Sequence, residues 1–224
     1  MTTTKPEISG GFFIISGPTA VGKSEIVRSL RKKHPEILYS ISCTTRKPRP
    51  TELDRIDYHF ITQEEFEKRI QNNDFYEYEK VHDNWYGTPK TEIVKAMKSG
   101  KDVVAVLDTK GYDHVRQIAP AYVTGIFIAP PSIDDIISRI QNRGTETPEE
   151  IQKRLGNMLR EFKMSTLYHH VIINENKEEI PNAIETAADK VWAIISSRRT
   201  SQYENFEFVH HFVENLSKYA VPNI

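Results

Sequence analysis

A short apolar run followed by a glycine-rich loop constrains the fold of this chain more than any other feature. The run covers residues 12–15, and residues 17–24 match the pattern G-x-x-x-x-G-K-[ST]. In that pattern the glycines let backbone N–H groups turn toward phosphate oxygens, the lysine reaches the β- and γ-phosphates, and the last hydroxyl can ligate Mg²⁺. Apolar residues at helical spacing follow, at Ile26, Val27 and Leu30. Strand, loop and helix therefore stand in the order that a nucleoside triphosphate site requires.

Composition excludes several classes of protein. With 224 residues, of which 38% are hydrophobic, the chain can bury one sizeable core. Its 30 basic and 31 acidic residues nearly cancel, which argues against nucleic acid and membrane surfaces as partners. The apolar runs are much shorter than the roughly 18 residues of a membrane span, and residues 1–9 lack a secretory apolar region. We expect a cytoplasmic protein in which the single cysteine, Cys43, is an ordinary packed thiol.

Strand and helix patterns alternate along most of the chain. Apolar runs predict strands at residues 12–15, 38–42, 103–107, 123–128 and 171–174. Helical spacing and capping residues predict helices at 24–33, from Ser132, from Thr147 and at 181–197. This alternation is typical of an α/β fold, a P-loop parallel sheet flanked by helices. Asp108 ends the most continuous apolar run, so we expect it at the ligand-facing carboxyl end of a central strand.

A different pattern, from about residue 45 to residue 100, interrupts this alternation. It contains predicted strands at 57–61 and 75–81, an aromatic turn at 84–88, and two helices, one opened by the capping box at 62–65. The other helix would have Thr88 as N-cap and Pro89 as its first residue, and would end at Gly100. The segment is predicted to form a small inserted α+β subdomain.

Cations cluster at the start of this insertion. Prolines oppose regular structure over residues 43–50, where Arg46 and Arg49 lie in an exposed turn. Two guanidinium forks suit a phosphate group, and the alternative is a solvated basic loop.

The second half of the chain carries a second group of cations. Arg139 and Arg143 share one helical face, the polar loop 144–148 follows, and the next helix carries Arg154. These features indicate a lid over about residues 139–160, although surface ion pairs would also account for the arginines. We place the main domain at residues 10–199. Residues 200–224 are predicted to form an amphipathic helical tail that docks on its own chain or on a second subunit of a homodimer.

Several segments, in order and spacing, resemble the guanylate kinase family over about residues 10–197. They are the loop 17–24, S-C-T-T-R-K-P-R-P at 42–50, Asp57-Tyr58, Glu77, N-W-Y-G-T at 84–88, Leu107-Asp108, P-P-S at 130–132 and R-G-T-E-T at 143–147. The resemblance implies transfer of a phosphoryl group from ATP with Mg²⁺ to GMP, on a P-loop core with a GMP-binding insertion and a helical lid.

The resemblance also implies which residues form each site. The ATP site would comprise Gly17, Pro18, Thr19, Ala20, Val21, Gly22, Lys23, Ser24 and Asn174, with Ser24 on Mg²⁺. The GMP phosphate would be held by Arg46, Arg49, Tyr58 and Tyr86, and the guanine base by Ser42, Glu77, Thr88 and Asp108. The catalytic cations would be Lys23, Arg139, Arg143 and Arg154.

The chain departs from the family pattern at a few positions. After the central strand the family commonly has Asp-x-Asp-x-Gln-Gly, whereas this chain has Val106 at the first carboxylate and Lys110 at the glutamine. Two other readings therefore stay open at this point. One is a non-catalytic guanylate-kinase-like module that binds proteins, and the other is a kinase that acts on a different monophosphate.

Overall fold

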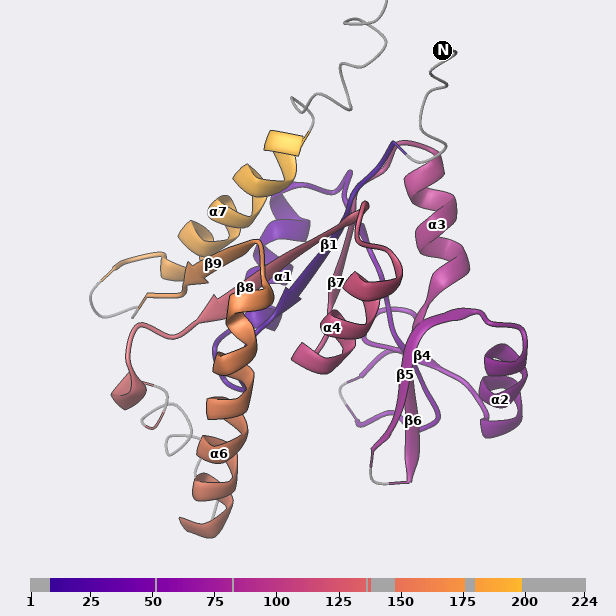
Figure 1. Ribbon diagram of the computed structural model, residues 1–224, viewed down its shortest axis with the longest axis horizontal. Helices are drawn as coiled ribbons and strands as arrows, with labels where there is room; N and C mark the ends of the chain where they lie inside the picture. Colours follow the sequence, from indigo (N-terminus) through magenta and orange to yellow (C-terminus); the bar gives the residue numbers. More distant parts are fainter. Residues whose placement is uncertain are drawn as a thin grey trace, which may run out of the picture.

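The main sheet contains five parallel strands in the order β2-β7-β1-β8-β9. The computed structural model describes residues 9–50, 52–81, 83–135, 137, 148–175 and 180–198, excluding the side chains of residues 81 and 148–155. The strands are β1 (Phe12–Ser16), β2 (Leu38–Tyr39), β7 (Val103–Val106), β8 (Val123–Ala129) and β9 (His170–Ile173). Figure 1 shows helices on both sides of this sheet, as the alternating pattern predicted.

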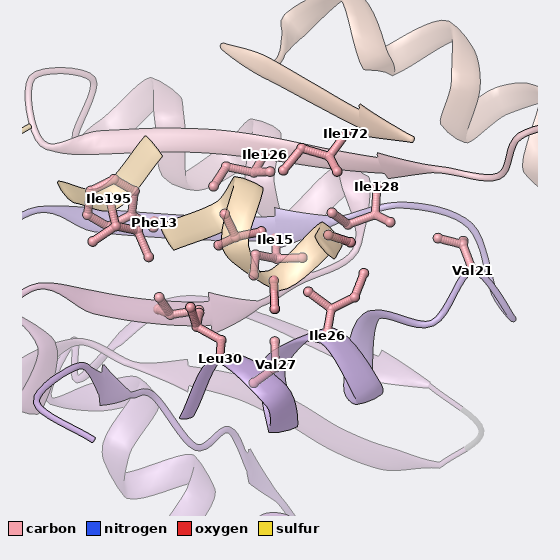
Figure 2. Close-up of a cluster of buried hydrophobic side chains, with 14 of the residues drawn as sticks. Phe13, Ile15, Val21, Ile26, Val27, Leu30, Ile126, Ile128, Ile172 and Ile195 are labelled. Carbon is pink, nitrogen blue, oxygen red and sulfur yellow. The ribbon is translucent and has the colours of Figure 1, made fainter. Parts of the chain in front are cut away.

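β1 lies at the centre of the sheet and separates two hydrophobic clusters. Because successive side chains of a strand point to opposite faces, Phe13 and Ile15 join one cluster, and Phe12 and Ile14 join the other. The first cluster packs under α1 (Lys23–Lys33) and α7 (Ala183–Arg198), as Figure 2 shows. The second packs under α3 (Lys90–Lys98) and α4 (Thr109–Ile118). Both faces of the sheet are thus buried, and the predicted α/β fold is confirmed.

A second, four-stranded sheet lies beside the first and has the order β4-β3-β6-β5 (Figure 1). Its strands are β3 (Cys43–Thr44), β4 (His59–Phe60), β5 (Phe75–Val81) and β6 (Asn84–Pro89). α2 (Gln63–Gln71) covers it through Phe66, whose ring stacks on Phe75 at 4.5 Å and on Trp85 at 5.8 Å. Thr62 caps α2, as predicted, by accepting a hydrogen bond from the Glu65 amide.

Three predictions for the insertion were wrong. Residues 84–88 do not form a turn, because they belong to β6 and pair antiparallel with β5. Residues 43–44 form β3 although the prolines beyond them suggested irregular backbone. Pro89, and not Thr88, occupies the N-cap of α3, because Thr88 is held in the sheet opposite Glu77. In each case pairing with a neighbouring strand decided the backbone conformation.

The core elements agree more closely with the sequence patterns. α4 was not predicted, although Asp108 marks its start by accepting a hydrogen bond from the Gly111 amide. The predicted strand at 38–42 is shorter, since only Leu38–Tyr39 pairs with β7. α6 (Pro148–Met164) forms where a helix was expected. The predicted tail 200–224 and most of the helix expected after Ser132 lie outside the described residues. Within the described part of the chain, no helix is long and apolar enough to cross a membrane.

Gly125 in β8 provides a test of packing between β8 and α4. A Cβ atom at this position would lie 2.3 Å from Cζ of Tyr112, a ring that is fully buried and stacked on Tyr168. Gly125→Ala is therefore expected to lower the free energy of unfolding by about 1–3 kcal/mol. In urea denaturation, the matched change Gly156→Ala in α6 should raise stability by up to about 1 kcal/mol, because no atom lies within 4 Å of the new methyl group. Equal stability of both variants would contradict the packing described for β8.

Candidate active site

The functional residues gather at the carboxyl ends of the parallel strands. β1 runs directly into the loop 17–24, and Asp108 follows β7, the neighbour of β1 in the sheet. In open α/β sheets ligands bind at this edge, at the point where the connections that follow two neighbouring strands turn to opposite faces of the sheet. The loop that carries the phosphate-binding pattern therefore lies beside the predicted carboxylate of the acceptor site.

Two glycines of the loop are required by its geometry. Gly17 has a φ of +146°, and a Cβ there would lie 2.2 Å from the carbonyl oxygen of Ile128 in β8. Gly22 has a φ of +91° and directly precedes α1. A positive φ is strained for residues other than glycine, and the close approach of the neighbouring backbone leaves no room for a Cβ atom. The loop thus passes tightly over the sheet edge and ends at a helix N-terminus, where backbone N–H groups favour anions.

Asn174, which directly follows β9, is hydrogen-bonded to this loop. Its side chain is 1% exposed, and its Nδ2 donates a hydrogen bond of 2.7 Å to the carbonyl oxygen of Val21. A Cβ on Gly22 would meet the same amide nitrogen at 2.6 Å. The predicted contact between Asn174 and ATP stays a prediction, and the observed bond gives this residue a second task, which is to fix the shape of the loop.

Lys23 folds back over the loop. Its Nζ donates to the carbonyl oxygens of Gly17 at 2.5 Å and of Pro18 at 2.8 Å. Burial lowers the pKa of Lys23, while the carboxylates of Glu161 and Asp108 act in the opposite direction. The ammonium group therefore lies inside the curve of the loop, in a partly desolvated setting where its charge acts strongly on a phosphate.

Glu161 in α6 was missed by the sequence analysis. Its pKa is raised by burial, which the charge of Lys23 opposes and that of Asp108 reinforces. Sequence patterns in this helix drew attention to arginines alone. Only the folded structure shows that the Glu161 carboxylate is half-buried and interacts with Lys23.

Oxygen donors suited to Mg²⁺ are present near the loop. Ser24 is exposed at the first turn of α1 and lines the adjacent cleft. Mg²⁺ in nucleotide sites usually takes one or two protein oxygens and fills its octahedron with phosphate oxygens and water. The hydroxyl of Ser24 fits that donor set.

Two of the residues predicted to bind guanine contact each other directly. The hydroxyl of Thr88 donates to Oε1 of Glu77 at 2.5 Å. A Cβ on Gly111 would lie 3.2 Å from Oδ1 of Asp108 and 3.5 Å from Oε2 of Glu77, so both carboxylates face the start of α4. Burial raises the pKa of Glu77 to about 7, although the hydrogen bond from Thr88 works against that rise. Glu77 is therefore a partly desolvated acceptor with oxygens that can receive two N–H donors.

The residues predicted to hold the acceptor phosphate form a second group. The guanidinium carbon of Arg46 lies 5.5 Å from the ring centroid of Tyr58, whose ring meets that of Tyr86 edge-on at 6.0 Å. Arg46 also forms a two-pronged ion pair with Glu52, a residue that no sequence pattern indicated. Arg49 is 73% exposed, and its Nη1 lies 3.9 Å from Glu52. The structure thus brings the four predicted phosphate ligands together, and the two arginines among them contact the unpredicted carboxylate of Glu52.

The pairing of β5 with β6 places residues from both predicted ligand groups, guanine and phosphate, on the same ribbon. Glu79 pairs with Tyr86, and Glu77 pairs with Thr88, so these side chains share one face of the β5–β6 ribbon. Tyr86 lies toward the phosphate ligands and Thr88 toward the base ligands. One face of the ribbon can therefore contact both ends of a nucleoside monophosphate.

A cleft of about 570 Å³ separates α1 from the loop that carries Glu52 and Tyr58. Ser42 and Ser24 line it, so residues predicted for the acceptor and for Mg²⁺ face a common space. Its helical wall carries Arg28 and Arg31, which were not predicted to belong to the site. The cleft connects the triphosphate loop with the acceptor region.

Several predictions are not tested by this geometry. Arg139 and Arg143 lie outside the described residues, and the side chain of Arg154 is not described.

Cys43 is buried beneath Arg69, and burial raises the pKa of its thiol to about 11, which agrees with an unreactive packed residue. Val106 packs against the core, and Lys110 lies 3.8 Å from Glu79.

Comparisons with known proteins agree on one family. The family model described as guanylate kinase matches residues 10–191. A guanylate kinase of Clostridioides difficile (strain 630) is 38% identical over 209 residues, which cover 92% of this chain and 98% of the relative. One from Clostridium perfringens (strain 13 / Type A) is 41% identical over 176 residues, or 79% of this chain and 81% of the relative.

A solved structure supports the same assignment. The crystal structure of guanylate kinase from Anaplasma phagocytophilum superposes with a TM-score of 0.68 at 26% identity, covering 88% of this chain and 91% of that one. Motif order, sheet topology and sequence identity over most of the chain therefore lead to one conclusion: the chain belongs to the guanylate kinase family.

Proposed function

We propose that this protein transfers the γ-phosphoryl group of ATP to GMP and releases ADP and GDP. Membership in the guanylate kinase family supports this activity. The observation that carries it is the half-buried carboxylate of Glu77, which is bonded to Thr88 and faces the start of α4 together with Asp108. The intact sequence Gly22-Lys23-Ser24 disfavours a module that only binds proteins.

The ATP side is built from the loop and α1. Backbone N–H groups of the loop would cradle the β- and γ-phosphates, and Lys23 would exchange the carbonyls of Gly17 and Pro18 for phosphate oxygens. Ser24 would hold Mg²⁺, which neutralises charge on the phosphates when bound. Arg139, Arg143 and Arg154 would close over the transferring group as part of a lid at about 139–160. The reaction needs no covalent protein intermediate.

The acceptor side is built from the insertion at about residues 45–100. Arg46, Arg49, Tyr58 and Tyr86 would donate hydrogen bonds to the GMP phosphate. Glu77 would accept from N1–H and the 2-amino group of guanine, with Ser42, Thr88 and Asp108 completing the base site. Adenine lacks this pair of donors, so AMP would leave a buried carboxylate unpaired. The reaction belongs to purine nucleotide metabolism, and its substrates favour a cytoplasmic setting.

The acceptor can be identified with one assay. ADP release, measured with ATP and Mg²⁺ against GMP, dGMP, AMP, UMP and CMP, is expected to be fastest with GMP and very slow with AMP and the pyrimidines. Faster use of AMP, UMP or CMP would support the kinase with a different acceptor. No ADP release with any acceptor, from a folded protein, would leave only the binding module.

Lys23→Ala is expected to abolish phosphoryl transfer while the protein stays folded, because the hydrogen bonds of the Lys23 ammonium to described residues go to two carbonyls of its own loop. Turnover should be measured together with the thermal midpoint. The matched change Lys33→Ala removes a cation at the other end of α1, where it pairs with Asp189 on the surface. It should leave turnover nearly unchanged. Near wild-type turnover of folded Lys23→Ala would disprove the proposed ATP site.

Glu77 makes base binding depend on pH. Because the pKa of Glu77 is raised to about 7, the carboxyl group gains a proton as pH falls and loses its ability to accept two donors. Guanosine affinity should weaken by up to about tenfold per pH unit below this pKa. Guanosine is the chosen ligand because its titration is not complicated by a phosphate group.

Glu77→Gln is the matched variant, since its amide does not titrate and accepts through one oxygen only. At a pH of about 8 it should bind guanosine roughly 5- to 150-fold more weakly than the wild type. This difference should shrink as pH falls toward about 6. Calorimetric titration would measure it, and a constant ratio across this pH range would refute the role of Glu77.

A further inference from the structure

The carboxylate of Glu52 has three hydrogen-bond donors in the acceptor region. Oε2 accepts from Nη1 of Arg46 at 2.9 Å and from the backbone amide of Arg49 at 2.8 Å, and Oε1 accepts from Nη2 of Arg46 at 2.9 Å. The side chains of Glu52 and Arg46 are only 15% and 17% exposed. Neither the motif pattern nor the implied ligand set included this residue.

These bonds occupy one end of the Arg46 guanidinium. The second proton of Nη1 is donated to the carbonyl oxygen of Lys47 at 2.8 Å. Three of the five N–H groups are therefore taken within the loop, and the Nε–H and the outer Nη2–H form a second fork that Glu52 does not occupy. Arg46 also hydrogen-bonds the side chain of Tyr86, another predicted phosphate ligand. A fork of this kind matches two oxygens of a phosphate. Glu52 thus determines which edge of Arg46 is left for an anion.

Two aromatic rings fix the plane of the same guanidinium. Its carbon lies 5.5 Å from the ring centroid of Tyr58 and 5.8 Å from that of Phe60. Tyr58 in turn contacts the ring of Tyr86. With the plane set by the rings and the in-plane direction set by Glu52, little rotation is left to the Arg46 side chain.

Glu52 also shapes the backbone at the other arginine. Its own amide donates to the carbonyl oxygen of Arg49 at 3.0 Å, while its carboxylate accepts from the amide of Arg49. These two bonds hold Glu52 against the backbone of Arg49. Hydrogen bonds from Arg46 and then from the Arg49 amide lower the pKa of Glu52, which keeps the carboxylate ionised at neutral pH.

We infer that Glu52 is a positioning residue for the acceptor phosphate: it orients the second fork of Arg46 and holds the backbone at Arg49 through two hydrogen bonds. This inference rests on the proposed function, since it assigns the phosphate of GMP as the anion that both arginines receive. Glu52 itself does not touch the nucleotide in this scheme.

If Glu52 instead competes with the phosphate for Arg46, the expected change in GMP affinity is the opposite. A carboxylate paired with a phosphate-binding arginine could compete with the phosphate, and its removal would then strengthen GMP binding. Positioning predicts weaker binding. The contacts favour positioning, because Glu52 is fixed by the backbone of residue 49 as well as by Arg46, and because the second fork of Arg46 is left for the phosphate.

The test compares GMP with guanosine in Glu52→Gln. The amide keeps the shape of the side chain but loses the charge and one accepting oxygen. GMP affinity, measured by calorimetric titration, should fall about tenfold, the loss typical of a disturbed charge-assisted hydrogen bond. Guanosine affinity and the KM for ATP should change by less than about twofold, because neither ligand places a phosphate against Arg46.

Glu65→Gln is the matched control. Glu65 pairs with Arg69 at 2.9 Å in α2 of the same insertion, so the substitution removes a similar ion pair away from the predicted phosphate ligands. It should leave both affinities unchanged. Thermal midpoints of both variants show whether they fold, and Glu52→Asp, which keeps the charge on a shorter side chain, replaces Glu52→Gln if that variant is unfolded.

A double-mutant cycle identifies the route of the effect. Arg46→Lys keeps a cation but has no fork, so Glu52→Gln added to it should cost clearly less GMP affinity than in the wild type, and the loss that remains would come from the bonds between Glu52 and the Arg49 backbone. Additive losses would show that Glu52 does not act through Arg46. Tighter GMP binding by Glu52→Gln, or an equal loss for guanosine, would also overturn the inference. The wild-type assay with GMP and ATP tests the proposed function separately, so either idea can fail alone.

Discussion

The whole arrangement depends on β1 being buried on both faces and hydrogen-bonded on both edges. It pairs with β7 on one side and with β8 on the other, and its side chains alternate between two separate hydrophobic clusters. Each cluster is closed by helices from distant parts of the sequence, as Figure 2 shows for the one beneath α1 and α7. A strand constrained from four directions gives the loop at its carboxyl end a fixed starting point.

That fixed point explains the close approach of the loop to its neighbours. Gly17 passes the carbonyl of Ile128 because β8 is paired with β1 in register, and Val21 reaches Asn174 because β9 is paired with β8. Sheet register thus sets the shape of the phosphate loop. The same register places Asp108, at the end of β7, beside Lys23.

Glu52 and Glu77 of the insertion have different surroundings, and these surroundings suit the two carboxylates to different roles. Glu52 faces two arginines, and their hydrogen bonds lower its pKa. Glu77 is half-buried near a second carboxylate, that of Asp108, and this partial burial raises its pKa to about 7. An ionised group held by cations suits a supporting role, whereas a desolvated acceptor without a cationic partner suits the reading of neutral N–H donors. The predicted phosphate and base ends of the acceptor site therefore differ electrostatically.

The sequence alone determined the loop, the core strands and the family, because these follow from spacing within segments and from the order of the segments along the chain. It also indicated the ligand residues, whose roles stay predictions. Glycines at 17 and 22, the lysine after them and the alternating apolar run before them are local signals. Only the tertiary structure decided that residues 84–89 form a strand, that Glu52 binds Arg46, and that Asn174, 153 residues away in the chain, holds Val21. Such contacts depend on the course of the backbone in three dimensions, whether the partners lie six residues apart, as Arg46 and Glu52 do, or 153 apart, as Val21 and Asn174 do, and they leave no periodic pattern in the sequence.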